Sequence, residues 1–361
     1  MLWTSTVAAG MIFFSVGVAF TVLTIYLPWV PLATSTGLTM WGVCLLFTEC
    51  MRQRDRMPVT GRVVLVTGCD TGLGHEMAKC LDSLGVIVFA GCLDSAGKGA
   101  ETLRTTCSSN LHVVQLDVTN DEQIDEVFCM IKNNCKELWG VVNNAGIGCW
   151  GAVEIVSMEW IQRTMDINTY GVVRVCKKFL PLIRISRGRI VNISSVRGLS
   201  SRALNSGYCM SKFALETLSD SLRREMKRFG VHVSVVEPAN FSLATEGGAP
   251  EKLDIPLRAD WDTITGELKS VYPREEYVEQ YLANSIKNKE MCGAKKDTTP
   301  INEAVLDGLF SRQPCCRYLI GGTDKIMDIG KVYVFLNWFL PCRTMDRILE
   351  GDSPHRVISK K

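Results

Sequence analysis

Residues 62–74 read RVVLVTGCDTGLG, and this stretch decides the fold. An apolar run leads into a turn with glycines at 68, 72 and 74, and a helical pattern, His75–Leu84, follows at once. Because glycine has no Cβ atom, such a turn lets the backbone approach a pyrophosphate, while the helix offers N–H groups and its positive dipole end. A strand, this turn and a helix in succession predict a dinucleotide-binding unit.

The next strand pattern, Val86–Ala90, leads to Asp94, which lies 20 residues after Gly74. An acidic residue at this spacing can accept a hydrogen bond from the adenosine ribose 2′-hydroxyl. Residues 91–97 contain no Arg or Lys that could bind a 2′-phosphate. The sequence therefore favours NAD over NADP as the cofactor.

Strand and helix patterns alternate along the rest of the chain. Further strands are predicted at 111–116, 139–142, 190–193, 231–236 and 317–320, and helices from 121, at 158–180, at 208–229 and at 301–311. This alternation predicts an α/β fold with a doubly wound parallel sheet. We expect Thr119 to cap the helix from 121, and residues 245–299 to be irregular apart from an amphipathic piece at 275–289.

A second informative stretch, residues 189–212, reads RIVNISSVRGLSSRALNSGYCMSK. Its β-branched run, 190–193, predicts a buried strand that presents Ser195 at its carboxyl end, where an open α/β sheet binds its ligands. Tyr208 and Lys212 lie four residues apart on one helix face. The ammonium is therefore expected to favour the phenolate of a residue whose free pKa is about 10.

A hydroxyl, a phenol of lowered pKa and a cation suit the interconversion of an alcohol and a carbonyl compound. When hydride leaves the carbinol carbon the hydroxyl proton must leave too, and a general base with a pKa near the working pH accepts it best. We predict Tyr208 as this base and Ser195 as the group that hydrogen-bonds the substrate oxygen. A Tyr and a Lys four apart also occur on solvated helix faces, so the pair gains meaning only from its partners elsewhere.

Composition narrows the classes of function. A chain of 361 residues fits one α/β domain with attachments. The net charge of +2, without a basic stripe and interleaved aromatic residues, argues against a nucleic-acid partner. The 15 cysteines lack the paired CxxC spacing of a zinc site, so we predict no metal and free thiols in a reducing compartment.

The amino-terminal region predicts a membrane anchor. The first 48 residues contain no charged residue and no His, and the run 2–27 exceeds the roughly 20 residues that cross a hydrocarbon core. A shorter run, 38–47, leaves one or two membrane helices as alternatives. The arginines within 52–56 place the following chain on the cytosolic side. We therefore expect an anchor at 1–50 and a basic linker at 51–61, and, without transit-peptide or signal-peptide features, the endoplasmic reticulum as the membrane.

Taken together, these segments resemble the short-chain dehydrogenase/reductase family. The resemblance covers roughly residues 62–320 and rests on TGCDTGLG, NNAG at 143–146, Ser195 with Tyr208 and Lys212, and the turn at Pro238. It implies a Rossmann fold and a catalytic tetrad of Asn168, Ser195, Tyr208 and Lys212. The cofactor contacts that it implies are Gly68, Gly72, Leu73, Gly74, Asp94, Asp117, Asn144, Ala145, Gly146, Tyr208, Lys212 and Pro238.

The resemblance also assigns roles within these sets. Lys212 would bind the nicotinamide ribose, Asn168 would hold a water that relays the proton outward, and Asp117 and Asn144 would line the adenosine. The family usually has a Thr that contacts the nicotinamide amide where this chain has Leu243. Ser242 and Thr245 are the candidate replacements.

Segments such as LWGVVNNAGI (138–147) and VSVVEP (233–238) are similar to one branch of the family. This branch holds the type 2 forms of 11β- and 17β-hydroxysteroid dehydrogenase, the membrane-bound retinol dehydrogenases and 3-hydroxybutyrate dehydrogenase. The implied function is NAD-dependent interconversion of a secondary or allylic alcohol and its carbonyl on a lipid, a steroid or a retinoid. A 3-hydroxybutyrate-type dehydrogenase is the alternative, in which Arg197 or Arg202 would bind the acid. A non-catalytic binding protein is a remote third reading.

The resemblance divides the chain into parts as well. The catalytic domain is expected at 62–322, with a substrate lid at about 245–300. Residues 323–361 are expected to pack on the lid or to rest on the membrane, because the run Val332–Leu340 is too short to cross a bilayer. Family members are commonly dimeric, which makes a homodimer the expected assembly.

Overall fold

The computed structural model describes residues 3–4, 15, 17–18, 37, 39–44, 56–135, 137–245, 250–279, 281–283, 297–323 and 328–350. Most of the expected anchor at 1–50, the linker up to residue 55, parts of the expected lid and residues 351–361 lie outside the described residues. Within the part that is described, no helix is long and apolar enough to cross a membrane.

One sheet runs through the domain, in the strand order β1-β8-β7-β6-β5-β2-β3-β4. Its strands are β1 (Trp3–Thr4), β2 (Val63–Thr67), β3 (Ile87–Cys92), β4 (Leu111–Gln115), β5 (Gly140–Asn143), β6 (Arg189–Ile193), β7 (His232–Pro238) and β8 (Arg317–Ile320). The strands from β2 to β8 pair in parallel, and β1 adds an antiparallel edge on β8. The predicted parallel sheet is confirmed.

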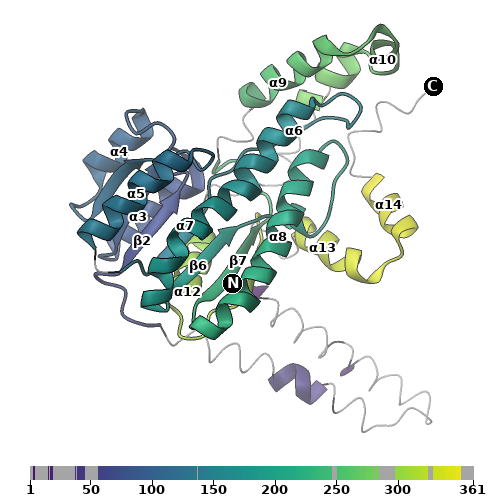
Figure 1. Cartoon of the computed structure of the whole chain (residues 1–361). Coiled ribbons are helices and arrows are strands. Elements are labelled where there is room, and N and C mark those ends of the chain that lie inside the picture. The colour runs from purple at the N-terminus through teal and green to yellow at the C-terminus, as the bar shows by residue number, and fades with distance from the viewer. Residues whose placement is uncertain are drawn as a thin grey trace.

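Helices cover both faces of this sheet (Figure 1). The main helices of the domain are α3 (Gly72–Ser83), α4 (Lys98–Thr106), α5 (Asp121–Asn134), α6 (Met158–Met165), α7 (Gly171–Ser186), α8 (Ser206–Met226) and α12 (Thr299–Phe310). One hydrophobic cluster joins α3, α4 and α12 to the sheet, and a second joins α5, α7 and α8 to the other face. All five residues of β2 are buried, as expected for a β-branched strand covered on both sides.

Two local expectations are wrong in detail. The N-cap of α5 is Asn120, whose side chain accepts a hydrogen bond from the Gln123 backbone, whereas Thr119 donates its hydroxyl to Asp117. Both are capping residue types, so composition alone does not choose between neighbours. The helical region at 158–180 is interrupted by η1 (Asp166–Tyr170), a π-helical turn between α6 and α7.

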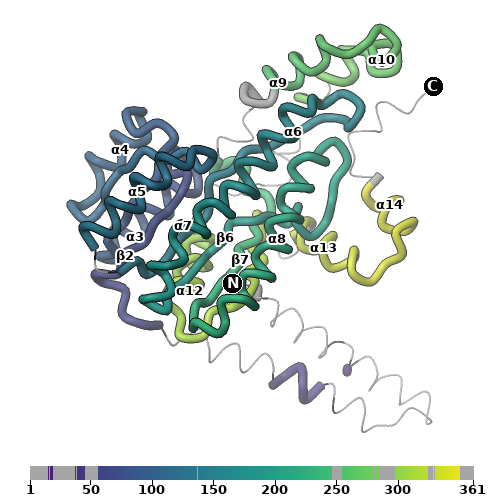
Figure 2. Tube along the Cα trace, in the orientation of Figure 1, coloured from purple at the N-terminus to yellow at the C-terminus, as the bar shows by residue number. Residues whose placement is uncertain are grey.

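The region expected to be irregular is largely helical where it is described. It contains α9 (Pro250–Thr263), α10 (Gly266–Val271) and the π-helical turn η5 (Glu275–Glu279), which lie beyond the amino-terminal end of α6 (Figure 2). The Tyr277 hydroxyl accepts a hydrogen bond from the Ala152 N–H at 2.8 Å. A small apolar cluster joins Leu257 and Tyr277 to Ile155. This insertion is therefore packed on the loop that follows β5.

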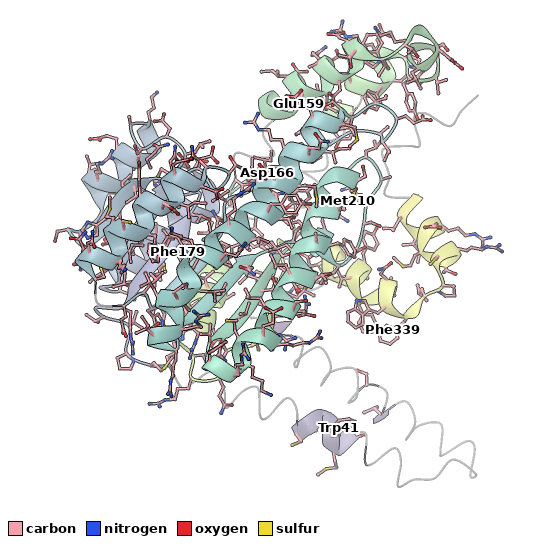
Figure 3. All side chains as sticks on the ribbon, viewed as in Figure 1. Trp41, Glu159, Asp166, Phe179, Met210 and Phe339 are labelled. Carbon is pink, nitrogen blue, oxygen red and sulfur yellow. The ribbon has the colours of Figure 1, made fainter. Side chains whose placement is uncertain are left out.

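The carboxyl-terminal part of the described chain forms two further helices. α13 (Ile329–Phe339) and α14 (Cys342–Glu350) lie at the side of the domain, near the end of α8 that carries Met210 (Figures 1 and 3). The Asn337 amide donates to the Leu199 carbonyl, which fastens α13 to the segment after β6. Two aromatic side chains near the end of α13 stay exposed, at 73% for Trp338 and 62% for Phe339.

The packing of α7 gives a stability prediction. Phe179 is fully buried and meets Phe128 edge-on at 5.8 Å, so we expect Phe179→Ala to lower the free energy of unfolding by about 3–5 kcal/mol. Ile185→Ala is the control, since Ile185 lies on the same helix and is 68% exposed, and it should change stability by less than about 0.5 kcal/mol. Denaturant unfolding followed by circular dichroism measures both, and equal stability losses would contradict the packing described.

Candidate active site

A cavity of about 710 Å³ opens at the carboxyl ends of the central strands. The chain runs outward from β2 to β3 and β4, and then returns to β5 on the other side of β2. At such a reversal the loops after the two strands part, and open α/β sheets bind ligands there. The cavity wall combines the loop after β2, the loop after β5, the segment 193–212 and the turn after β7.

The loop after β2 forms a cradle that only glycine permits. Gly68 and Gly72 adopt positive φ angles of 70° and 64°. A Cβ atom at Gly68 would lie 2.8 Å from Ala145 Cα, and one at Gly74 would lie 2.1 Å from the Gly68 oxygen. The N-cap residue of α3, Thr71, makes no side-chain capping hydrogen bond, so the first N–H groups can bind an anion. The cradle thus fits a pyrophosphate.

The loop after β5 supports this cradle. The Asn144 side-chain amide donates to the carbonyls of Thr67, at 2.9 Å, and Gly68, at 3.0 Å. The Thr67 hydroxyl accepts from the backbone N–H groups of Asn144 and Ala145. Asn144 and Ala145 do line the cavity, together with Gly146. The Asn144 amide, however, braces the glycine loop, a role that the sequence analysis missed.

The adenosine end of the cavity differs from the expectation at one residue. Its wall includes Asp70, Leu93 and Asp117, but not Asp94. The Asp94 carboxylate accepts from the Ala96 N–H within its own turn, at 3.0 Å. The Asp70 carboxylate accepts from the N–H groups of Leu93 and Asp94, each at 2.9 Å. Sequence spacing pointed to Asp94, and the structure adds Asp70 as a second acidic candidate, at a position between the loop glycines.

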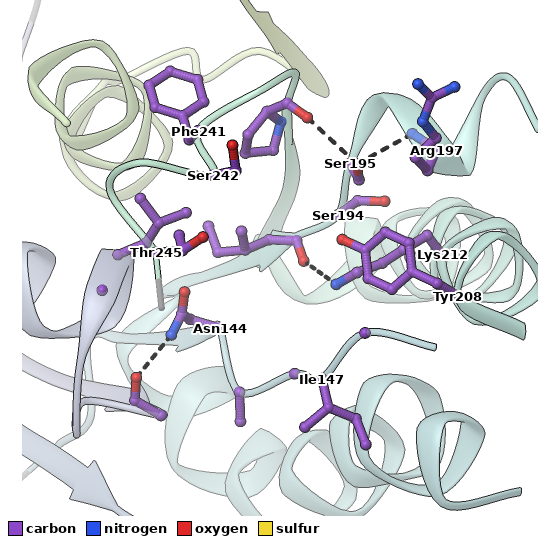
Figure 4. Close-up of a pocket in the computed structure, with 18 of the residues that line it drawn as sticks. Asn144, Ile147, Ser194, Ser195, Arg197, Tyr208, Lys212, Phe241, Ser242 and Thr245 are labelled. Carbon is purple, nitrogen blue, oxygen red and sulfur yellow. Dashed lines mark hydrogen bonds between the residues drawn. The ribbon is translucent and has the colours of Figure 1, made fainter. Parts of the chain in front are cut away.

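Ser195 and Tyr208 come together as predicted (Figure 4). Ser195 follows β6 and is 6% exposed; its hydroxyl donates to the Pro238 carbonyl at 3.4 Å and accepts from the Arg197 N–H at 3.1 Å. Burial raises the pKa of Tyr208, while a hydrogen bond with Ser195 and the charge of Arg197 lower it. The expected net lowering of this pKa is therefore wrong for the protein alone, because removal of the phenol from water is the largest effect.

Lys212 is held on the strand that carries Ser195. Its ammonium is buried and donates to the Ile193 carbonyl at 2.9 Å, and it lies 5.7 Å from the centre of the Tyr208 ring. Burial lowers the pKa of Lys212 to about 8, against the negative charge of Glu216, which raises it. The ammonium therefore stays charged at neutral pH and loses its proton above about pH 8.

Asn168 lies on the π-helical turn η1 and is fully buried. Its Oδ1 accepts from the Ile147 N–H and its Nδ2 donates to the Ile147 carbonyl, both at 2.8 Å. Nδ2 also donates to the Ser211 hydroxyl at 3.0 Å, one residue from Lys212. Asn168 thus ties the loop after β5 to α8, although Ile147 and not Asn168 forms the cavity wall. π-Helical turns often occur at functional sites.

The opposite wall follows β7. Pro238, Ser242 and Thr245 line the cavity, whereas Leu243 does not and is 44% exposed. The buried Ser242 hydroxyl has no hydrogen-bond partner among the described residues. An orphaned buried hydroxyl at a cavity wall suits a ligand contact. Ser242 therefore fits the place of the family threonine better than Leu243 does.

The substrate end of the cavity is both aromatic and cationic. Its wall contains Trp150, Tyr281 from the insertion and Tyr333 from α13. Arg197 and Arg202, which come from the segment between Ser195 and Tyr208, complete it. The residues described here can thus hold a dinucleotide at one end and an alcohol beside the Tyr208 phenol at the other.

Three kinds of known protein are similar to this chain. A model of the short chain dehydrogenase family matches residues 62–253. D-beta-hydroxybutyrate dehydrogenase of Mus musculus, a mitochondrial protein, is 40% identical over 72% of this chain and 76% of its own length. Retinol dehydrogenase 5 of Mus musculus is 35% identical over 89% and 96%, and estradiol 17-beta-dehydrogenase 2 of Mus musculus is 34% identical over 85% and 78%.

A solved structure agrees with the fold. A short-chain dehydrogenase from Streptomyces avermitilis superposes with a TM-score of 0.60 at 23% identity, over 81% of this chain and 96% of its own. The family match spans the glycine loop, Ser195, Tyr208 and Lys212, and the relatives are alcohol and carbonyl oxidoreductases. The protein therefore belongs to the short chain dehydrogenase family, as an alcohol dehydrogenase that uses a nicotinamide cofactor.

Proposed function

We propose that this protein is an NAD-dependent oxidoreductase that interconverts a secondary or allylic alcohol of a lipid, such as a steroid or retinoid, and its carbonyl. The observation that carries the proposal is the meeting of Tyr208, Ser195 and Lys212 in a cavity whose other end is a phosphate cradle. The retinol dehydrogenase 5 match, over 96% of that protein's length, supports the substrate class.

Each catalytic side chain has a defined role in this proposal. The Ser195 hydroxyl hydrogen-bonds the substrate oxygen, and Tyr208 takes the hydroxyl proton during oxidation and returns it during reduction. The Lys212 ammonium favours the phenolate through its charge and binds the nicotinamide ribose. Asn168 fixes the loop and holds the water that relays the proton. The bound nicotinamide supplies the hydride acceptor.

The same proposal assigns the cofactor contacts. The residues proposed to bind the dinucleotide are Gly68, Gly72, Leu73, Gly74, Asp94, Asp117, Asn144, Ala145, Gly146, Tyr208, Lys212 and Pro238. Asp70 joins them because its carboxylate lies in the cavity wall beside Leu93. A carboxylate there repels a 2′-phosphate, and residues 91–97 offer no cation to bind one. Both features support NAD over NADP.

A small hydroxy acid is the second candidate substrate. Arg197 and Arg202 line the cavity and could pair with a carboxylate, and the D-beta-hydroxybutyrate dehydrogenases share 40–41% identity with this chain. The neutral lipid remains the first candidate because the wall near Tyr208 includes Trp150, Tyr281 and Tyr333. The two candidate substrates differ in charge, so turnover measured with a panel of neutral alcohols and hydroxy acids distinguishes between them.

We also propose a membrane location. Trp3 and Thr4 pair with β8 in the sheet, and the remaining charge-free residues up to 48 support an anchor. The arginines after it support a catalytic domain that faces the cytosol at the endoplasmic reticulum. The domain would span 62–322 with its lid at 245–300, and it would form a homodimer. The exposed Trp338 and Phe339 support a resting place for the 323–361 segment on the bilayer, because aromatic rings favour that interface.

The catalytic assignment predicts the behaviour of Tyr208→Phe. Purified full-length protein should form NADH with a neutral steroid or retinoid alcohol, and the variant should lose at least about 10² in kcat because the general base is removed. The variant should still bind NADH, because the other proposed cofactor contacts remain. Tyr170→Phe, at a residue that is 54% exposed, should keep full turnover. If the protein oxidised 3-hydroxybutyrate but no neutral lipid alcohol, and Arg202→Glu abolished this activity, the substrate would be the hydroxy acid and not a lipid. Unchanged turnover in Tyr208→Phe would refute the assignment.

The charge of Arg197 predicts a pH effect. Because Arg197 lowers the pKa of Tyr208, Arg197→Gln should raise that pKa. Less phenolate is then present at any given pH, so the acid limb of kcat/KM for a neutral alcohol should move to higher pH. Arg202→Gln is the matched control in the same cavity wall and should leave this limb in place. Equal shifts in both variants would show that Arg197 has no special effect on the base.

The membrane proposal predicts that changes in α13 affect KM for a bilayer-dissolved alcohol but not for a water-soluble one. In the full chain reconstituted in phosphatidylcholine vesicles, replacement of Trp338 and Phe339 together by Glu should raise KM about tenfold for a retinoid dissolved in the bilayer, because the exposed rings no longer seat the cavity on the lipid. KM for a water-soluble secondary alcohol should stay the same. Ile185→Glu, at an exposed residue of α7, is the control. A parallel rise for both alcohols would instead indicate a damaged site.

A further inference from the structure

The helix that carries the proposed base continues as a stripe of ionisable groups. Tyr208, Lys212, Glu216 and Asp220 follow one another at four-residue spacing along α8, so they share one helix face. Lys212 and Glu216 are only 5% and 6% exposed. A carboxylate is rarely buried this deeply unless it is paired. The stripe therefore extends the site one turn below Lys212.

Arg317 of β8 contacts the two acidic residues of this stripe, Glu216 and Asp220. Its guanidinium contacts the Glu216 carboxylate, donates to Glu237 Oε1 of β7 at 2.7 Å, and lies 3.0 Å from Asp220 Oδ1. The Glu216 and Glu237 side chains are 7% and 2% exposed, so two buried carboxyl groups share one cation. Such a pair cannot easily carry two negative charges, and one member tends to keep its proton.

Burial raises the pKa of both carboxyl groups, and the charge of Arg317 acts against the rise in each. The charge of Glu216 further raises the pKa of Glu237. The direct contact of the Arg317 guanidinium with Glu216 and with Asp220 favours negative charge on α8, and Glu216 is the member of the pair that lies one turn from Lys212 on that helix.

Tight packing confines Glu216 beside the catalytic segment. Gly198 belongs to η2 (Val196–Gly198), and a Cβ atom there would lie 3.0 Å from Glu216 Cγ, 3.0 Å from the Lys212 carbonyl oxygen and 2.9 Å from Ser194 Oγ. Glu216 thus fills the space between α8 and the residues that follow β6. The negative charge of Glu216 raises the pKa of Lys212. Charged groups of neighbouring residues also act on this stripe. Arg197 of η2 lowers the pKa of Tyr208, Arg317 lowers and Asp220 raises the pKa of Glu216, and Glu216 raises the pKa of Glu237.

We propose that Glu216 is a positioning residue that acts through Lys212: it keeps the ammonium charged and seated on the Ile193 carbonyl, while Arg317 and Glu237 fix Glu216 in place. The inference rests on the proposed role of Lys212 in catalysis. Glu216 touches neither the cavity nor Tyr208, so its effect on the reaction passes through the charge of the lysine. Without that carboxylate, the buried ammonium keeps only a neutral carbonyl as its partner and loses its proton at lower pH.

The test compares Glu216→Gln with Asp220→Asn in the full-length protein. Both remove a carboxylate from Arg317 and keep the side-chain shape, but only Glu216 acts on Lys212. The first readout is the pH titration of the Lys212 side chain, followed by NMR of protein labelled at lysine Cε and assigned with Lys212→Arg. The second readout is the alkaline limb of kcat/KM for a neutral alcohol.

In Glu216→Gln, both the titration of Lys212 and the alkaline limb should move about one unit to lower pH. Asp220→Asn should leave both in place, and Glu216→Asp, which keeps the charge, should bring them back toward wild type. Glu216→Ala gives the same comparison if Glu216→Gln does not fold. An unshifted titration in a folded, charge-free variant overturns the inference. A shifted titration in a protein that oxidises no alcohol supports the coupling and instead refutes the proposed function.

Discussion

A single buried hydrogen bond, from the Lys212 ammonium to the Ile193 carbonyl, sets the geometry on which the rest of the site depends. It joins α8 to the end of β6, a strand paired on both sides within the sheet. Because Tyr208 lies one turn before Lys212, the bond also fixes the phenol beside Ser195. A buried ammonium needs such partners, since burial penalises its charged form. The backbone dipole of Ile193 thus holds the proposed catalytic cation in place, and the charge of Glu216 favours its protonated form.

The loops around the cavity are held by the same kind of contact. Thr67, Asn144 and Asn168 each use a side chain to satisfy backbone groups of a neighbouring loop. These hydrogen bonds join groups of the protein itself, so they form without a bound ligand. A site braced in this way is organised before the cofactor arrives, which reduces the reorganisation that binding and reaction require.

Much of this arrangement could be predicted from the sequence because its signals are local. The β-branched runs gave the parallel strands, and β8 has the predicted bounds of 317–320. The glycine loop and the Tyr208–Lys212 spacing pointed to residues that line one cavity in the structure. Nothing local marked Asn168, because its burial depends on Ile147 and Ser211, which lie 21 and 43 residues away along the chain.

Three further details also depend on the folded structure and not on local sequence. Spacing selected Asp94, whose Oδ1 accepts from the Ala96 N–H, and did not show that Asp70 lies in the cavity wall. The sequence shows a lysine four residues from Tyr208 but not the depth of burial, which reverses the direction of the Tyr208 pKa shift. In α9, an internal Pro256 and many charged residues conceal a helix that packing on Ile155 and Tyr277 stabilises.

The proposed catalytic residues and the aromatic wall of the cavity come from different parts of the chain. Ser195, Tyr208 and Lys212 lie within one stretch, where the strand and the helix fix their geometry together. The aromatic wall, in contrast, is assembled from the loop after β5, the insertion and α13, which supply Trp150, Tyr281 and Tyr333. Fold and catalytic residues therefore do not by themselves determine the alcohol, and relatives that share the fold are named for hydroxybutyrate, retinol and estradiol.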